Sequence, residues 1–129
     1  MSEPRLRLPL VHHRMGGADF ARAYELGRRA QGAGLTVVVH ENGKERTRIG
    51  LSVGKRVDKR AVRRNRVRRR YREAFRLSLS ELPVGIDVIL IGTPGAVELP
   101  MPALRRELVE LVARALKKKP RRPRGEAAS

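Results

Sequence analysis

The chain has 129 residues, and its 30 Lys and Arg against 13 Asp and Glu give a formal net charge of +17. This length suits one domain with a core large enough to fold alone. The absence of cysteine excludes disulfides and cysteine-based zinc sites, and it is typical of the reducing cytoplasm, where we expect the protein to act. The N-terminus lacks the apolar segment of a signal peptide and no apolar run could span a bilayer, so we expect no membrane partner.

The first predicted helix follows an irregular arm. Residues 1–17 contain two prolines that oppose a helix, and they are expected to form an N-terminal arm. Asp19 is the expected N-cap of a short helix that runs to about Arg29. Phe20 and Tyr24 stand four residues apart, so their rings should share one face of that helix.

Two β-strands are predicted next. Leu35–His40 contains three consecutive valines, and Thr47–Gly54 alternates apolar and polar residues. The alternation should place two sets of side chains on opposite faces of the sheet: Ile49, Leu51 and Val53 on one, Arg48, Gly50 and Ser52 on the other. The dipeptide Asn42-Gly43 between the strands is a strong turn signal, so we expect the two strands to pair as a hairpin.

The second half of the chain predicts a long helix, a strand and a last helix. The long helix should run from about Lys59 to Leu82. Val84–Ile91 is almost entirely apolar and should be central in the sheet. Apolar residues at helical spacing between Leu104 and Leu116 predict the last helix.

The predicted elements define one domain. The order α-β-β-α-β-α, with room for one further short strand, predicts an α+β fold in which a small sheet is packed with helices on one side. We expect this single α+β domain to cover residues 18–118. Residues 119–129 are basic and rich in proline, and they should form a disordered tail.

The long predicted helix carries most of the charge. Between residues 55 and 76, twelve Lys and Arg oppose two carboxylates, for a net charge of +10. The apolar stripe of the helix begins only at Val67, and upstream of it arginines point around the whole axis. Arginines recur every four residues from Arg64 to Arg76, a spacing of about 6 Å along the axis, and their planar guanidinium groups suit phosphate. Such a dense positive charge indicates a polyanionic partner, and the composition favours nucleic acid.

The strings Arg64-Asn65-Arg66 and Arg68-Arg69, followed by Arg72 and preceded by Lys55-Arg56, resemble the signature of the bacterial ribonuclease P protein family. Arg68 stands where that family usually has Lys, which keeps the charge. Flanking segments also look similar to the family: Asp19-Phe20, Tyr24, Gly27, Arg48–Val53, Ile86–Ile91 and Pro94–Ala96. The resemblance covers roughly residues 14–116.

The resemblance implies the protein subunit of a ribonucleoprotein that removes 5′ leaders from precursor tRNA. The RNA subunit is the catalyst and requires Mg²⁺, while the protein side chains bind no cofactor and need no obligate protein partner. The implied fold is ribonuclease P protein-like, with a rare left-handed βαβ crossover through the basic helix. The implied contacts with the catalytic RNA are Lys55, Arg56, Arg60, Arg64, Asn65, Arg66, Arg68, Arg69 and Arg72.

The resemblance also implies that the 5′ leader lies in a cleft between the sheet and the first helix. Phe20 and Tyr24 would stack on leader bases, with Arg48 and Ser52 contributing from the strand. The family often carries aromatic residues at the positions of Leu35 and Val38, where this chain is aliphatic. Stacking would then depend on the two rings of the helix.

The sequence assigns no catalytic residue and no metal site to the chain. No carboxylate pair, P-loop, zinc motif or Ser or Cys triad is present, so strand scission would belong to the RNA and its metal ions. An alternative that the residues leave open is a structural RNA-binding protein, such as a ribosomal protein with a similar small α+β fold. A DNA-binding protein is less favoured, because no helix-turn-helix or dimer seam is recognisable.

Overall fold

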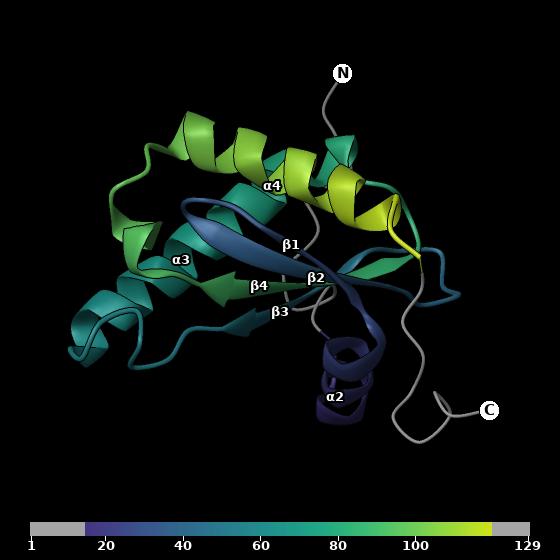
Figure 1. The fold of residues 1–129 in the computed structure, drawn as a ribbon, viewed down its shortest axis with the longest axis horizontal. Helices are drawn as coiled ribbons and strands as arrows, with labels where there is room; N and C mark the ends of the chain where they lie inside the picture. The colour runs from purple at the N-terminus through teal and green to yellow at the C-terminus, as the bar shows by residue number, and fades with distance from the viewer. Residues whose placement is uncertain (1–14, 120–129) are drawn as a thin grey trace.

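The computed structural model describes residues 15–119, which form a four-stranded sheet with helices on both faces (Figure 1). The elements are α2 (Gly17–Leu26), β1 (Arg28–Gln31), β2 (Leu35–Glu41), β3 (Arg48–Ser52), α3 (Ala61–Ser78), β4 (Ile86–Gly92) and α4 (Met101–Leu116), with 3₁₀ turns η2 (Leu79–Glu81) and η3 (Pro94–Val97). The predicted α+β class is confirmed, and β1 is the further short strand. Most of the predicted arm and tail lies outside the described residues.

Strand β4 lies at the centre of the sheet, as its apolar sequence predicted. The strand order is β1-β2-β4-β3. β2 is antiparallel to β1 and β4, whereas β3 is parallel to β4. The chain therefore passes from β3 to β4 through α3, in the βαβ connection that the resemblance implied.

The predicted hairpin between β2 and β3 is wrong. The turn itself forms, with Gly43 at a φ of 70°. However, β4 lies between the two strands and pairs with both. The side chain of Asn42 donates a hydrogen bond of 2.8 Å to Asp87 on β4, which ties the turn to the inserted strand. A turn signal depends on the local backbone alone and does not report which strand will lie beside its arms.

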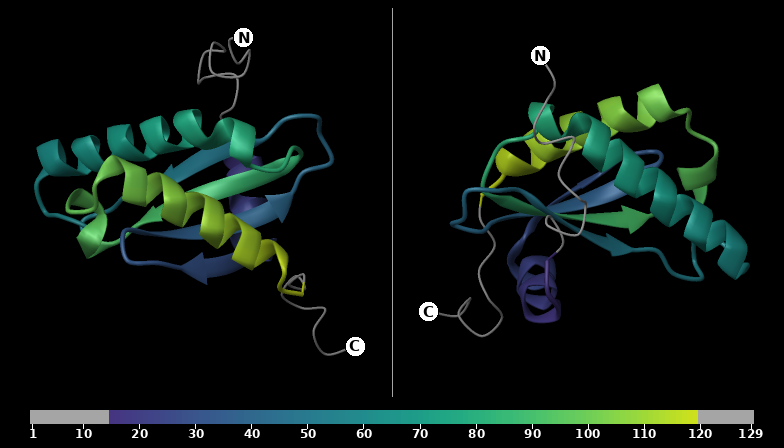
Figure 2. Two further views of the ribbon diagram at one scale, coloured as in Figure 1. Left: turned by 90° about the horizontal axis from the view of Figure 1, so that it is seen from above. Right: turned by 180° about the vertical axis from the view of Figure 1, so that it is seen from behind.

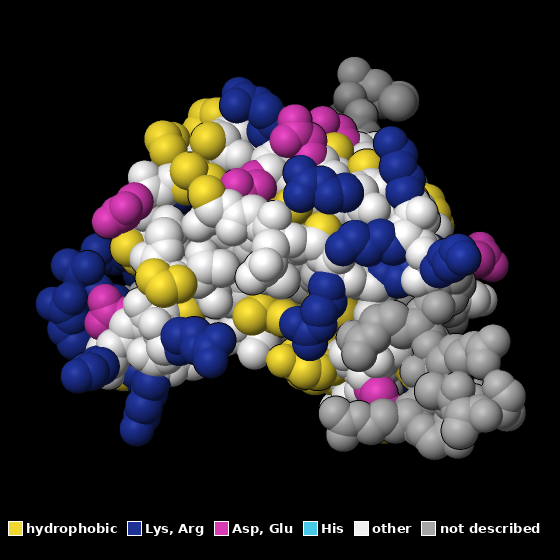
Figure 3. Space-filling view, in the orientation of Figure 1, with side chains coloured by type: hydrophobic (Ala, Val, Ile, Leu, Met, Phe, Trp, Pro, Cys, Tyr) yellow, Lys and Arg dark blue, Asp and Glu magenta, His cyan; other side chains and the backbone are white. Residues whose placement is uncertain are grey.

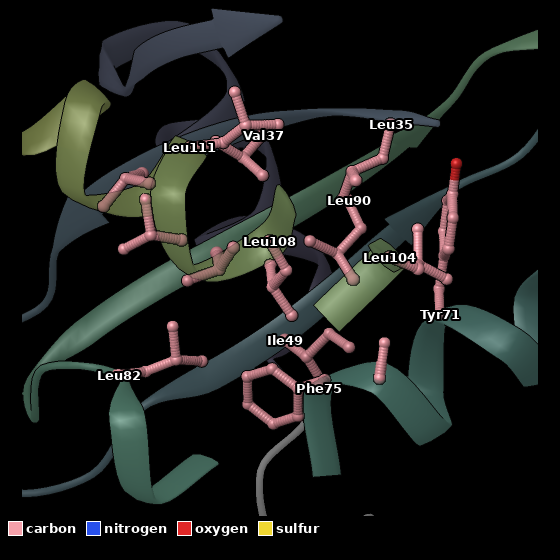
Figure 4. Packing of buried hydrophobic residues seen from close by; sticks show 14 of the residues in the cluster. Leu35, Val37, Ile49, Tyr71, Phe75, Leu82, Leu90, Leu104, Leu108 and Leu111 are labelled. Carbon is pink, nitrogen blue, oxygen red and sulfur yellow. The ribbon is translucent and has the colours of Figure 1, made fainter. Parts of the chain in front are cut away.

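Helices α3 and α4 cover one face of the sheet, and α2 covers the other (Figure 2). The larger core, between the sheet and α3 and α4, contains Tyr71, Phe75, Leu90 and Leu108 (Figure 4). A smaller core contains Ala23, Val38 and Ile89. The expectation of helices on one side only is therefore wrong. The central strands are apolar on both faces, so each face needs a cover.

The first helix differs from its prediction at both ends. Its N-cap is Gly16, and Asp19 lies within the first turn, where its carboxylate binds Arg48 instead of a backbone amide. The helix ends at Leu26, and the next residues form β1. At Gly27 a Cβ would lie 2.4 Å from a Val38 methyl group, so only glycine lets the chain turn directly from α2 into the sheet.

Helix α3 has the two halves that the sequence predicted. Its buried residues begin at Val67 and continue through Tyr71, Ala74, Phe75 and Ser78. The helix starts at Ala61 and becomes a 3₁₀ turn after Ser78, so the predicted span of 59–82 is slightly too long. In Figure 1 the first turns of α3 extend beyond the edge of the sheet, and none of residues 61–66 is buried.

Two buried or partly buried polar groups hold the turn between β1 and β2. The Glu107 carboxylate of α4 accepts hydrogen bonds from the backbone amides of Ala33, Gly34 and Leu35, at 2.7–3.1 Å. The Tyr71 hydroxyl of α3 donates to the Gly34 carbonyl at 2.6 Å, and burial raises the pKa of Tyr71, so it remains a donor. These bonds join both helices to one end of the sheet. No helix among the described residues is both long and apolar enough to cross a membrane.

Candidate nucleic-acid interface

An exposed basic surface lies at the start of α3 and in the loop before it. Lys and Arg side chains gather there at the left of Figure 3. We define this basic surface by its exposed members: Lys55, Arg56, Lys59, Arg60, Asn65, Arg66 and Arg69. Because these residues come from one loop and three helical turns, the surface combines a fixed helical part with a loop part.

The cations of the basic surface differ in how far the protein itself uses them. Within the described residues, no hydrogen bond or ion pair engages the side chains of Arg66 and Arg69, so both are free to bind phosphate. Arg60 pairs with Asp58 at 3.2 Å. The backbone amide of Arg60 and its guanidinium lower the pKa of the Asp58 carboxyl, which stays ionised.

Two further arginines of the predicted site lie on the flank of α3 that faces β3. Arg64 donates to the carbonyls of Asp58 and Lys59, at 3.1 and 2.8 Å. Arg68 donates to the Val53 carbonyl at 2.9 Å. These bonds fix the loop between β3 and α3. Both residues are half-buried, and Arg68 also donates to the Asn65 side chain at 2.7 Å.

A hollow of about 250 Å³ connects this arginine flank to α2. It follows the free edge of β3, and it is lined by Met15, Phe20, Ile49, Gly50, Leu51, Arg68 and Arg72. At Gly50 a Cβ would lie 2.7 Å from the Phe20 ring, so glycine is required for the ring to lie on the strand. The hollow therefore has an aromatic wall on one side and guanidinium groups on the other.

The two rings of α2 form one platform. Phe20 and Tyr24 stack with their centroids 6.2 Å apart and an angle of 18° between their planes. Phe20 is half-buried against the sheet, whereas 41% of Tyr24 is exposed. Tyr24 thus keeps accessible surface for a ligand, and Phe20 packs against it.

Arg29 is a site residue that the sequence did not reveal. Its guanidinium lies 4.7 Å from the centroid of the Tyr24 ring, a cation–π contact. The predicted helix included residue 29, which concealed its position on β1. The signal that could have located it is the register of β1, which pairs Arg29 with Val38 and so turns its side chain toward α2.

Arg48 is buried in the structure and bonded to carboxylates of the protein itself. Only 6% of the residue is exposed, and its guanidinium makes two bonds of 2.8 Å to the buried carboxylate of Asp87 and one of 3.0 Å to Asp19. The hydrogen bonds to Asp87 raise the pKa of Arg48. We therefore expect Arg48 to hold α2 on the sheet and to have no direct contact with RNA.

The remaining residues of the predicted cleft divide between the two faces of the sheet. Ser52 is half-buried on β3 and faces the α2 side, as its alternation predicted. Val38 also faces α2 but is completely covered there. Leu35 lies in the other core, under α3 and α4. Neither aliphatic residue could stack on a base, so the aromatic surface of the cleft consists of Phe20 and Tyr24.

Comparison with known proteins decides the family. The sequence profile described as Ribonuclease P matches residues 13–116. The chain belongs to the ribonuclease P protein family. The ribonuclease P protein component of Microcystis aeruginosa is 36% identical over 112 residues, 84% of this chain and 93% of that protein. That of Chloroflexus aggregans is 38% identical over 99 residues, 76% of this chain and 73% of that protein.

Solved structures of this family share the fold. The RNase P protein from Thermotoga maritima superposes with a TM-score of 0.69 at 26% identity, covering 78% of this chain and 96% of that one. The RNase P protein of Staphylococcus aureus gives a TM-score of 0.67 at 28% identity, covering 80% of this chain and 94% of that one. The resemblance inferred from the Arg-Asn-Arg string is thus confirmed, and the ribosomal alternative is not supported.

We predict that Arg48→Met lowers the free energy of unfolding by about 3–5 kcal/mol, because it leaves the Asp87 carboxylate buried without its cation. Urea unfolding followed by circular dichroism measures this loss. Arg46→Met is the matched control, since Arg46 is exposed in the loop just before β3, and it should change stability by less than about 0.5 kcal/mol. Equal, small effects of the two substitutions would show that the buried pair contributes little.

Proposed function

We propose that this chain is the protein subunit of ribonuclease P, which binds the catalytic RNA through the basic surface and the 5′ leader of precursor tRNA through the cleft beside α2. Binding in this way aids the Mg²⁺-dependent removal of the leader in the cytoplasm. The observation that carries the proposal is the hollow along β3, since it joins an arginine-bearing helix to a stacked aromatic pair.

The basic surface suits a large structured RNA. Arg66 and Arg69 are exposed on the outer side of α3, so they can meet phosphates of a second molecule without loss of internal bonds. Lys55 and Arg56 extend the same charge into the loop. Arginine can bind phosphate oxygens with two parallel hydrogen bonds, which fixes orientation as well as charge.

The cleft suits a single strand of variable sequence. Stacking on a ring requires only the flat face of a base, and every base has one. Tyr24 provides an accessible ring beside Phe20, and Arg68 and Arg72 line the hollow that Phe20 borders, where a backbone would pass. In this proposal the chain supplies cations and a stacking platform, and the RNA subunit with its Mg²⁺ performs the cleavage.

The proposal predicts that the chain lowers the Mg²⁺ concentration at which its cognate RNA cleaves precursor tRNA, because protein cations replace part of the ionic screening. Cleavage is measured at low Mg²⁺ for the RNA alone, the chain alone and both together. Only the combination should be efficient. Robust cleavage by the chain without RNA, abolished by one carboxylate or His substitution, would overturn the proposal.

We predict that Arg66→Ala weakens assembly with the RNA subunit and leaves the fold intact, because this exposed side chain makes no bond within the described residues. The slope of log K against log salt should decrease by about 1 for a lost phosphate contact. Equilibrium titrations at several salt concentrations measure both quantities. Arg106→Ala, an exposed arginine on α4, is the control and should change neither.

Tyr24→Ala should weaken binding of precursor tRNA to the holoenzyme more than binding of mature tRNA. The expected loss is about 1–3 kcal/mol for complete stacking, and Tyr24→Phe should retain most of the affinity because it keeps the ring. Paired titrations with leader-bearing and leaderless tRNA measure the difference. An equal loss for both ligands would place the leader elsewhere.

A further inference from the structure

A cationic hollow lies at the β1 edge of the sheet, at the opposite end of α2 from the basic surface. Two cavities of about 370 and 320 Å³ share Arg29 and Lys118 in their walls. The full lining is Arg28, Arg29, Ala30, Gln31, Thr36, Lys118 and Lys119. It contains four cations, an amide and a hydroxyl, and no carboxylate. We call this site the β1 hollow.

The cations of the β1 hollow are held in place by bonds between α4 and β1. Arg28 donates to the carbonyls of Leu116 and Lys118, at 3.1 and 2.9 Å, and so fastens the end of α4 to the strand. The Lys118 ammonium donates to the Arg29 carbonyl. Within residues 15–119, Arg28 pairs with the Glu41 carboxylate, which is not part of the lining. The site is therefore arranged before any ligand arrives.

The two neutral polar residues of the β1 hollow, Gln31 and Thr36, belong to a row of cross-strand partners that reaches β3. Gln31 pairs with Thr36, and Thr36 pairs with Ile91, which in turn pairs with Ser52 on β3. These four residues form one row across the α2 side of the sheet. Neighbouring strands lie about 4.8 Å apart, so the row spans about 14 Å. That distance corresponds to about four nucleotides at the 3.4 Å rise of a stacked strand, and to fewer if the strand is extended.

We propose that the β1 hollow binds a backbone phosphate of the precursor leader, upstream of the bases that stack on Tyr24. Arg29 and Lys118 supply the charge, and Gln31 and Thr36 supply neutral donors. This inference rests on the proposed function. With the catalytic RNA on the basic surface near β3, a leader that crosses the row carries its distal part to β1.

Arg29 has a double part in this arrangement. Its guanidinium lies over the Tyr24 ring in a cation–π contact. The same residue lines the hollow. One residue thus joins the stacking platform to the phosphate site, so a leader too short to reach β1 would gain only the stacking.

The test compares three ligands of the holoenzyme: leaderless tRNA, precursor with a leader of about two nucleotides, and precursor with a leader of about eight. For the natural chain, affinity should increase from the short leader to the long one. The double variant Arg29→Gln/Lys118→Gln should lose about tenfold on the long leader and little on the other two, the equivalent of about one charge-assisted bond. Arg29→Lys keeps the charge and should retain most of the affinity.

Several outcomes would overturn the inference. Equal losses of affinity for all three ligands would show that the phosphate bound at the β1 hollow belongs to the catalytic RNA or to mature tRNA and not to the leader. An unchanged long-leader affinity would show that no leader phosphate binds at β1, and if Tyr24→Ala still impairs leader binding, the proposed function stands without it. A natural chain that does not distinguish leader-bearing from leaderless tRNA would overturn both. Arg46→Gln/Arg106→Gln, which also removes two exposed cations, is the charge-matched control, and melting temperatures establish that each variant folds.

Discussion

The pairing of Arg48 with Asp87 is the interaction on which the arrangement of the cleft depends. A carboxylate on the central strand is stable in the interior only if a cation and hydrogen bonds compensate it. Arg48 supplies both from β3, Asn42 adds a bond from the turn, and the third guanidinium nitrogen, Nη1, donates to Asp19 on α2. One buried ion pair therefore joins the edge strand, the central strand and the helix that carries Phe20 and Tyr24.

On the opposite face of the sheet, helix α3 combines residues that pack in the core with exposed residues that are available for binding. From Val67 onward one side of α3 contributes to the core, whereas Arg66 just before it and Arg69 on the other side of the helix are exposed. Charge repulsion in the first turns is offset by the packing of the later ones, because both belong to one continuous hydrogen-bonded helix. The protein can thus present Arg66 and Arg69 on a rigid element at the edge of the molecule.

Periodicity predicted most elements because each signal was local. The alternation of Ile49 and Leu51 located β3, and the apolar run before Ile91 located the central strand. The same reasoning failed where partners were distant. Asn42-Gly43 indicated a hairpin, yet β4 lies between β2 and β3 and pairs with both. A strand that is buried on both faces needs a neighbour on each edge, because its backbone hydrogen-bonding groups have no access to water. Arg28, the residue after Gly27, likewise depends on distant partners. Its side chain bonds to the backbone carbonyls of Leu116 and Lys118, 88 and 90 positions away in the chain.

The sequence by itself determined the α+β class, the basic helix and the family, because composition, spacing and the Arg-Asn-Arg string need no knowledge of the packing. Only the tertiary structure decided which polar residues are buried and which are exposed. It buried Arg48 against Asp87, although the family resemblance made this residue a candidate for the leader. It also brought Arg29 onto Tyr24 and placed Lys118 beside Arg29. Burial and charge pairing are set by residues far apart in the chain, and no local pattern records them.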